Sequence, residues 1–364
     1  MKFSRFERIL ILQCRGLGDA LISTLIINSI HKTWQHVKID IWASPEVATL
    51  FQQNPAVNHC YIQSLPIIRR YKFTWGAVAR LLSAIRRLRA RRYDLCMNLV
   101  GDFRENLLTY LVGAKSTWAI SWDAEHPFRR LIRPGLSWLI DYNEYITRET
   151  VNVYSVYELV AKNLGCRDAS AYEVGRSDTA SSQIEAVGKK VGIHPLAGQA
   201  CREWPFDSWN ELIEGILQLG FDIIVFGEAS KRDVLENAFM EWRQEPRIVI
   251  ETHKLTEFMN RLAGMVAFVG LDSFAIHAAH MLGVPSVMIN GANDPACWAP
   301  PGTQVLGDGG GCEAYPCYNN PKCIGKEGEY VCIREIKVSD VLAALKVKLA
   351  VTQLSRSQLP ERVP

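Results

Sequence analysis

The sequence lacks the features that mark membrane-spanning and secreted proteins. None of its apolar runs approaches the roughly 20 residues that a bilayer-spanning helix needs. The amino-terminal stretch MKFSRFERILILQC has no small-residue cleavage site of the kind that ends a secretory signal. Repeats of solenoid length and low-complexity tracts are absent as well. We therefore expect a globular, cytosolic protein whose 364 residues suffice for two domains.

Negative charge is missing from one stretch of the sequence, residues 66–92. The whole chain carries a net charge of only +3, which does not indicate a nucleic-acid partner. Between residues 66 and 92, however, there is no acidic residue, which predicts affinity for an anionic surface. A solvated helix face is the alternative. The nine basic residues of this stretch are Arg69, Arg70, Lys72, Arg80, Arg86, Arg87, Arg89, Arg91 and Arg92.

The ten cysteines do not form a disulfide-scaffold pattern. Six are scattered, several of them in apolar runs, where a reduced thiol packs as a small hydrophobic group. The other four, Cys312, Cys317, Cys323 and Cys332, fall in one loop whose spacing barely meets that of a zinc site. Two hypotheses stay open: a structural zinc or iron site, or reduced and facultatively paired thiols. No catalytic role is expected.

Apolar runs rich in β-branched residues alternate with segments of helical period. Strands are predicted at 7–14, 37–43 and 93–100, with helices at 20–33, 75–91 and 151–164. A polar segment rich in Ser and Ala follows. The alternation then restarts, with strands at 191–195, 221–227, 246–251, 265–270 and 284–290, helices at 206–220, 230–243, 255–264 and 273–283, and a last helix from 337.

Two β/α series predict an α/β protein with two doubly wound parallel-sheet domains. We expect domains at 1–170 and 189–336, a linker at 171–188, a carboxyl-terminal helix at 337–350 and a tail at 351–364.

A glycine turn opens the first series. Gly16 and Gly18 match only half of a dinucleotide fingerprint, because Leu21 occupies the third glycine position. This disfavours an NAD-linked oxidoreductase. Asp19 would repel a pyrophosphate, so it is interpreted either as a helix cap or as a general base.

The second series carries the residues that suit a diphosphate. The loop HPLAGQACREWP offers the Arg202 guanidinium and the backbone amides around Ala197 and Gly198. Further on, VGLDSFAIHAAH predicts that Asp272, Ser273 and His277 lie where a strand meets its helix. In an open α/β sheet, ligands bind at that edge.

Four segments, RGLGDALIST, HPLAGQACREWP, GLDSFAIHAA and NGANDP, resemble the landmarks of glycosyltransferase family 9, the lipopolysaccharide heptosyltransferases. The resemblance spans about residues 8–350. It implies a GT-B fold, in which two Rossmann-like domains face a central cleft, and inverting transfer from ADP-heptose to a sugar hydroxyl of the lipopolysaccharide inner core. It also implies that no metal is required, in agreement with the lack of an Asp-x-Asp pair placed to carry one.

This resemblance assigns the candidate residues to roles. Asp19 would be the general base, and Arg202 would stabilise the departing diphosphate. The resemblance implies that the acceptor is a lipopolysaccharide core or another glycan, and we expect peripheral association at the cytoplasmic face of the inner membrane. The alternatives are another nucleotide sugar, a protein acceptor, or a non-catalytic nucleotide-binding module. Donor-binding candidates are Ala197, Gly198, Glu228, Asp272, Ser273, His277, Asn293 and Asp294; acceptor-binding candidates are Arg15, Gly16, Gly18, Arg69, Arg70 and Lys72.

Overall fold

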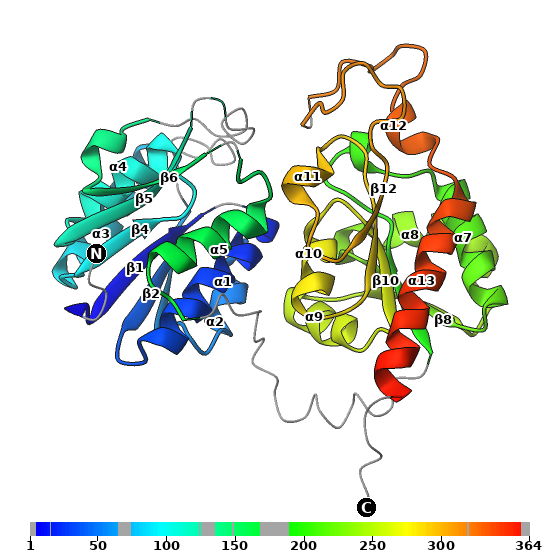
Figure 1. The fold of residues 1–364 in the computed structure, drawn as a ribbon, viewed down its shortest axis with the longest axis horizontal. Helices are drawn as coiled ribbons and strands as arrows, with labels where there is room; N and C mark the ends of the chain where they lie inside the picture. The colour runs from blue at the N-terminus through cyan, green and yellow to red at the C-terminus, as the bar shows by residue number, and fades with distance from the viewer. Residues whose placement is uncertain are drawn as a thin grey trace, which may run out of the picture. The chain divides into compact units, whose positions relative to one another are not determined.

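A computed structural model describes residues 5–14, 16–64, 74–123, 125, 135–147, 149–167, 189–318 and 320–357 (Figure 1). Internal contacts divide the chain into two compact units, Met1–Gly175 and Arg176–Pro364, called unit 1 and unit 2 below. The predicted linker at 171–188 lies outside the described residues. The cleft expected between the units stays a prediction.

Unit 1 is built on a six-stranded parallel sheet in the order β3-β2-β1-β4-β5-β6. In its middle, Leu12 pairs with Trp42 on one side and with Asn98 on the other. The strands are β1 (Arg8–Gln13), β2 (Lys38–Ala43), β3 (His59–Ile62), β4 (Leu95–Asn98), β5 (Ser116–Trp122) and β6 (Tyr142–Ile146), and the helices are α1 (Leu17–Thr33), α2 (Ala48–Gln52), α3 (Trp75–Ala90), α4 (Phe103–Val112) and α5 (Val153–Asn163), with a 3-10 turn at Ser137–Leu139.

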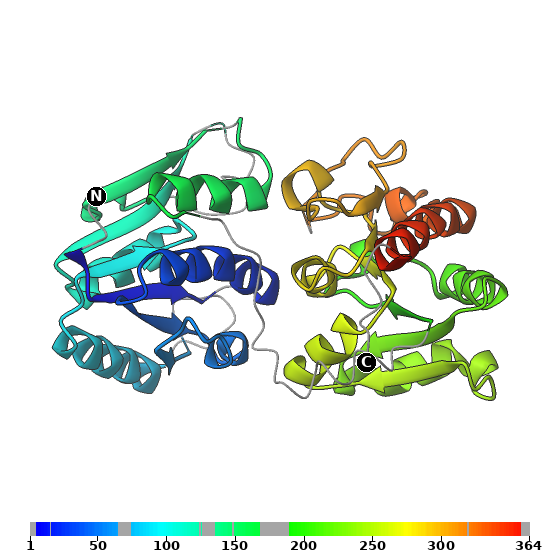
Figure 2. The same ribbon diagram turned by 60° about the horizontal axis from the view of Figure 1, so that its bottom comes forward.

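Helices cover both faces of this sheet (Figures 1 and 2). Because side chains alternate along a strand, Leu10 and Leu12 of β1 point to one face, where they pack with Leu88 of α3 and Leu108 of α4. On the other face lies α1, whose residues 20–30 are all buried. A parallel sheet covered on both faces explains why these strands are apolar throughout.

Unit 2 repeats the topology with the strand order β12-β11-β10-β7-β8-β9. Counted from its own first strand, this order is the same as in unit 1, and both match the Rossmann order. The prediction of two Rossmann-like units is therefore confirmed. The strands are β7 (Lys190–His194), β8 (Asp222–Gly227), β9 (Ile248–Thr252), β10 (Ala267–Leu271), β11 (Ser286–Ile289) and β12 (Gln304–Leu306), and the helices are α7 (Phe206–Gln218), α8 (Arg232–Ala238), α9 (Leu255–Ala263), α10 (Phe274–Met281), α11 (Pro295–Trp298), α12 (Val331–Arg334) and α13 (Val338–Ser357).

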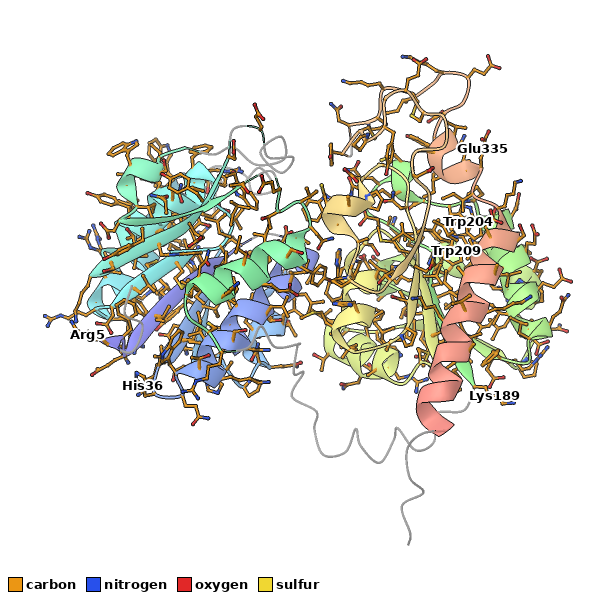
Figure 3. All side chains as sticks on the ribbon, in the orientation of Figure 1. Arg5, His36, Lys189, Trp204, Trp209 and Glu335 are labelled. Carbon is orange, nitrogen blue, oxygen red and sulfur yellow. The ribbon has the colours of Figure 1, made fainter. Side chains whose placement is uncertain are left out.

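The core of unit 2 fixes the loop that follows β7. Trp204 and Trp209 are buried and pack edge to face, with ring centroids 5.3 Å apart (Figure 3). The indole of Trp204 also donates a hydrogen bond to the carbonyl of Ile336. Helices α7 and α13 approach closely at Gly215, where an added Cβ would meet Leu342 at 2.5 Å. These contacts hold the end of the 195–205 loop on the sheet.

Two helices differ from their predicted extents. The helix expected at 230–243 is divided into a 3-10 turn, α8 and a second 3-10 turn. The cause is tertiary, because the side chain of Asn210 bonds both the carbonyl of Ala238 and the indole of Trp242. The last helix continues to Ser357, so residues 351–357 extend it and do not begin the expected tail.

Candidate functional site

Both sheets have a point where the strand order reverses, between β1 and β4 in unit 1 and between β7 and β10 in unit 2. Helices leave neighbouring strands in opposite directions there, so a crevice opens at the carboxyl ends of the strands, and ligands bind in it. The Asp19 turn follows β1, and the Arg202 loop follows β7. Each unit thus places its candidate residues at its own switch point.

In unit 1, Gly16 is the N-cap of α1, and Asp19 lies in the first turn of that helix. Asp19 is therefore not the N-cap residue of α1, so the interpretation of Asp19 as an N-cap is wrong. Its Oδ2 lies 4.0 Å from the place where a Cβ on Gly16 would stand, so the carboxylate faces the glycine turn. A negative charge is favoured at this end of a helix.

Tyr157 of α5 is a neighbour of Asp19 that sequence reasoning missed. The phenol is buried, and its pKa is raised first by burial and then by the charge of Asp19. The ring therefore stays neutral beside the carboxylate. Nothing in the pattern of the α5 sequence distinguishes this tyrosine from a core residue, so only packing reveals the proximity.

The acceptor-side candidates are only partly described. Gly16 and Gly18 lie in the turn before and at the start of α1, as expected. Arg15, Arg69, Arg70 and Lys72 lie outside the described residues.

A polar turn between β4 and α4 borders the switch point of unit 1, and sequence reasoning missed it as well. Buried Asp102 caps α4 and holds Arg104 through both carboxylate oxygens, at 2.9 and 3.0 Å. The side-chain oxygen of Asn98 accepts hydrogen bonds from the backbone amides of Val100 and Gly101. Gly101 has a φ of 77°, and a Cβ there would lie 2.2 Å from a backbone oxygen. The turn is thus rigid and presents a fixed guanidinium.

The described part of the basic stretch lies mainly on α3. Its six arginines (80, 86, 87, 89, 91 and 92) are all exposed, and none forms an ion pair within the described residues. Trp75 and Leu82, exposed by 83% and 49%, share one side of the helix with Arg86 and Arg89, at spacings of seven, eleven and fourteen residues. We call these four residues the α3 ridge.

In unit 2, Arg202 ends a short 3-10 turn, Ala200–Arg202. Its Nη1 donates a 2.9 Å hydrogen bond to the carbonyl of Asp272, which directly follows β10. The Nε atom of Arg202 is buried and has no hydrogen-bond partner. A buried donor without a partner is costly, so a ligand that accepts from it would gain more than an ordinary surface contact.

Asp272 is buried, and burial raises the pKa of its carboxyl above the ordinary 3.8. Arg202 and a hydrogen bond from the Asn293 side chain oppose that shift without cancelling it. Two separate donor-side candidates, Asp272 and Asn293, are thus brought together. Asp294, by contrast, caps α11 by accepting the amide of Ala296 at 2.9 Å.

Ser273 is the N-cap of α10, yet its side chain makes no capping hydrogen bond. Its Oγ is buried and has no partner. The hydroxyl and the first amides of α10 therefore lie together at a helix terminus that favours an anion.

His277 lies one turn further along α10 and is buried. Burial, with a smaller effect of His280, lowers the pKa of its imidazole to about 3. The ring is neutral at physiological pH, so it does not supply a positive charge to a diphosphate. Any contact from His277 is that of a neutral donor or acceptor.

The backbone amide of Ala197, a predicted donor to the diphosphate, already forms a hydrogen bond within its own loop, which sequence reasoning did not foresee. It donates to Glu203 Oε1 at 3.2 Å. Gly198 stands beside the Arg202 guanidinium, which lies 3.6 Å from the place of an added Cβ. Glu203 thus braces the loop from within, and the amide of Ala197 already has its hydrogen-bond partner.

Glu228 directly follows β8, the strand beside β7. In a Rossmann unit, an acid after the second strand binds the ribose hydroxyls. Burial lowers the pKa of the nearby His194, and the negative charge of Glu228 opposes part of that shift. Glu228 therefore faces the same edge of the sheet as the Arg202 loop.

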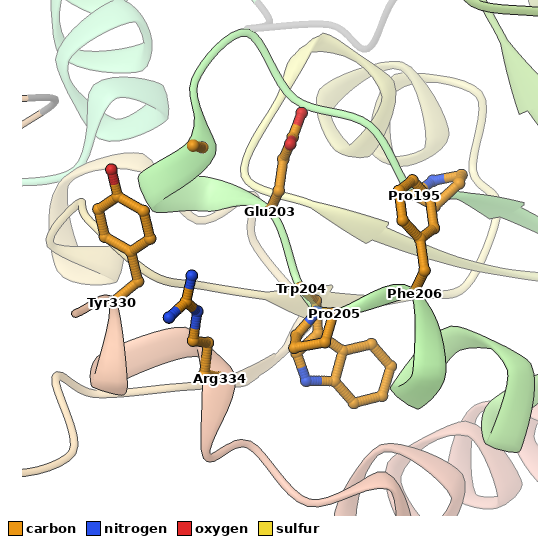
Figure 4. A pocket seen from close by; sticks show the side chains of 8 residues that line it. Pro195, Glu203, Trp204, Pro205, Phe206, Tyr330 and Arg334 are labelled. Carbon is orange, nitrogen blue, oxygen red and sulfur yellow. The ribbon is translucent and has the colours of Figure 1, made fainter. Parts of the chain in front are cut away.

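A pocket of about 250 Å³ is lined in part by residues of that loop (Figure 4). Aromatic rings and prolines form most of its wall, and the guanidinium of Arg334 lies over the ring of Tyr330 at 5.3 Å. The lining residues are Pro195, Ala200, Glu203, Trp204, Pro205, Phe206, Tyr330 and Arg334.

Comparison with known proteins decides the family. A model of glycosyltransferase family 9 (heptosyltransferase) matches residues 81–326, more than half of the chain. The chain belongs to glycosyltransferase family 9. This family 9 enzyme is 24% identical, over 78% of its own length and 83% of the relative's, to lipopolysaccharide heptosyltransferase 3 of Escherichia coli.

Solved structures agree on the fold. A family 9 glycosyltransferase from Veillonella parvula superposes with a TM-score of 0.74 at 18% identity, covering 95% of this chain and 98% of the other. The E. coli ADP-heptose lipopolysaccharide heptosyltransferase II gives a TM-score of 0.70 at 19% identity, with coverages of 95% and 99%. The family 9 enzyme therefore has the GT-B fold.

The loop that carries Cys312, Cys317, Cys323 and Cys332 is the candidate metal site. Within the described part of the chain, no group of three or more His, Cys, Asp or Glu side chains is arranged to hold a metal ion. None of the ten cysteines is in a disulfide. A more distant structural relative, the heptosyltransferase TibC, is iron-containing, with a TM-score of 0.54, 15% identity and coverages of 97% and 78%.

Proposed function

We propose that this enzyme transfers a heptose from ADP-heptose to a sugar hydroxyl of the lipopolysaccharide inner core. The observation that carries the proposal is the hydrogen bond from Arg202 to the Asp272 carbonyl at the switch point of unit 2, next to the buried, unpartnered hydroxyl of Ser273. In unit 1 a carboxylate, Asp19, follows the corresponding strand. The family and the names of its relatives support the choice of donor and acceptor.

Unit 2 holds the donor in this proposal. Glu228 binds the ribose hydroxyls, while Arg202, the Ser273 hydroxyl and the first amides of α10 bind the diphosphate. As the glycosidic bond breaks, negative charge grows on the diphosphate. A guanidinium held in place by the backbone of Asp272 stabilises that charge without reorganising. Transfer then proceeds without a metal.

Unit 1 holds the acceptor, through the glycine turn, Arg104 and the basic segment. Asp19 accepts the proton of the attacking hydroxyl as the new carbon–oxygen bond forms, and the anomeric carbon inverts in a single displacement. Tyr157, kept neutral beside Asp19, has no role as a competing base.

We also propose that the enzyme works at the cytoplasmic face of the inner membrane, with the α3 ridge against the bilayer. Its arginines face anionic headgroups, each contributing about 1 kcal/mol near the surface, and Trp75 with Leu82 enter the interface. None of the described helices combines the length and apolarity of a membrane-crossing segment.

The decisive assay offers purified enzyme a panel of ADP-, GDP- and UDP-sugars with truncated lipopolysaccharide acceptors. Heptose transfer from ADP-heptose alone is expected. Transfer from a different nucleotide sugar would redirect the donor assignment, and binding of ADP without any transfer would favour a nucleotide-binding module. Thermal stabilisation by ADP but not by NAD supports the donor half independently of turnover.

A further inference from the structure

Five of the ten cysteines gather around one backbone segment of unit 2. Cys201, in the turn before Arg202, is 3% exposed. Its carbonyl oxygen would lie 2.7 Å from a Cβ on Gly291, so the two backbones touch at a place only glycine permits. The amides of Cys317 and Tyr318 both donate to the carbonyl of Ala292, the residue that follows Gly291. Cys201 and Cys317 thus contact two consecutive residues of one backbone segment, Gly291 and Ala292.

Three more cysteines belong to the group, and one of them, Cys323, is close enough to raise the pKa of both Cys201 and Cys332. Cys332 lies on α12, next to Ile333, which also packs against Gly291. The amide of Cys312 donates within the turn at 309–312, and Gly310 of that turn borders the backbone of Cys332. Sequence spacing alone groups only the four loop cysteines. The fold adds Cys201 from a segment more than one hundred residues earlier.

Electrostatics agrees with this proximity. The pKa of Cys201 is raised by burial and then by Cys317, while Arg202 lowers it. The pKa of Cys332 is raised to about 11 by burial and by the other four thiols. The buried thiols are therefore poor nucleophiles, and reaction must begin at a more exposed one, such as half-buried Cys317.

We propose that Cys201 and Cys317 form a dithiol–disulfide switch that controls the donor loop; its effect on donor binding rests on the role proposed above for Arg202. The oxidant is a small-molecule disulfide. Cys317 sulfur attacks it and releases one thiol; Cys201 sulfur then displaces the second. One sulfur–sulfur bond breaks and one forms, and the two protein protons leave on the two released thiols.

The switch acts through the residue next to Cys201. A disulfide requires sulfurs about 2.05 Å apart and Cα atoms within about 7 Å, whereas no pair of cysteines is bonded in this structure. Closing the bridge draws the 200–202 turn toward residue 317. The hydrogen bond between Arg202 and the Asp272 carbonyl is then lost, and donor affinity falls.

The test uses the full-length enzyme in reduced form and after treatment with oxidised glutathione. Peptide mapping by mass spectrometry should find a Cys201–Cys317 bridge, and calorimetry should find ADP binding at least ten-fold weaker, restored by dithiothreitol. Cys201→Ala and Cys317→Ala should each keep the reduced-state ADP affinity and lose the response. Cys60→Ser, a half-buried thiol of unit 1, is the matched control and should respond like the wild type.

Three results would overturn the switch: no bridge that includes Cys201, a bridge that leaves ADP affinity unchanged, or about one metal ion per chain that is lost in Cys317→Ala. Failure of the proposed function looks different, because the reduced enzyme would then bind no ADP while the bridge would still be detected by mass.

Discussion

Arg202 Nη1 lies 2.9 Å from the backbone oxygen of Asp272, a residue 70 positions further along the chain. This hydrogen bond ties the β7–α7 loop to the β10–α10 turn across the switch point of unit 2. The guanidinium is thereby fixed by backbone, while its Nε remains without a partner. This contact holds the guanidinium at the place where the diphosphate is proposed to bind.

Arg202→Ala should weaken ADP binding by at least ten-fold in calorimetry, because a charge-assisted contact to the diphosphate is removed. Arg202→Lys should recover only part of the loss, since an ammonium cannot reproduce the guanidinium fork. The control is Arg232→Ala, which removes an exposed guanidinium paired with Glu236 at the surface. Equal ADP affinity in all three variants would contradict the assignment.

Asp19→Asn should lower kcat by about 10²- to 10⁴-fold, the range for loss of a positioned general base. ADP affinity should stay within about two-fold, because Asp19 belongs to unit 1. Steady-state kinetics with saturating donor measures the first quantity, and calorimetry the second. Asp123→Asn, at a site after β5, serves as the carboxylate control. Near-normal turnover in Asp19→Asn would leave the aspartate with only a structural role.

Asp272→Asn should increase the free energy of unfolding at neutral pH while weakening ADP binding. The folded pKa of Asp272 is raised, so its burial costs stability as pH rises from about 3.8 through the folded value. Asparagine has no such cost and still accepts the bond from Asn293. Urea unfolding between about pH 3.5 and about pH 7.5, a range that covers ordinary carboxyl titration, should show the stabilities of the two proteins diverging as pH rises. Parallel curves would argue against a buried charge at this position.

His277 should make the protein sensitive to acid. Its folded pKa is about 3 against an ordinary 6.5, so the unfolded chain takes up the proton first. The contribution of His277 to the free energy of unfolding is fully present above pH 6.5. Below that pH it falls by about 1.4 kcal/mol per pH unit, until the folded state is itself protonated near pH 3. His277→Gln should flatten this decline in urea titrations, whereas His36→Gln, at an exposed site, should not. An unchanged slope in His277→Gln would mean that other groups cause the acid lability.

Charge reversal on the α3 ridge, Arg86→Glu with Arg89→Glu, should abolish sedimentation with vesicles that contain anionic lipid. The matched control, Arg243→Glu with Lys346→Glu, changes the net charge equally on exposed sites of unit 2 and should bind normally. Binding by the wild type should weaken as salt rises, because these charges are solvent-exposed. If both double variants lose binding alike, overall charge and not the ridge is responsible.

The sequence by itself determined the α/β class, the two Rossmann-like units and the positions of Asp19, Arg202, Asp272 and Ser273 after their strands. Periodicity and turn residues are local properties, and the carboxyl end of a parallel strand is where a loop residue must emerge. The single helix predicted at 230–243 was wrong, because Asn210 of α7 bonds the carbonyl of Ala238, where α8 ends.

Only the tertiary structure decided which groups meet and what state they are in. The Glu203 carboxylate accepts a hydrogen bond from the amide of Ala197, and burial keeps the His277 ring neutral. Tyr157 stands beside Asp19, and Cys201 joins the thiols of a loop far along the chain. Hydrogen bonds and desolvation depend on neighbours that folding brings together, and no local pattern of residues encodes them.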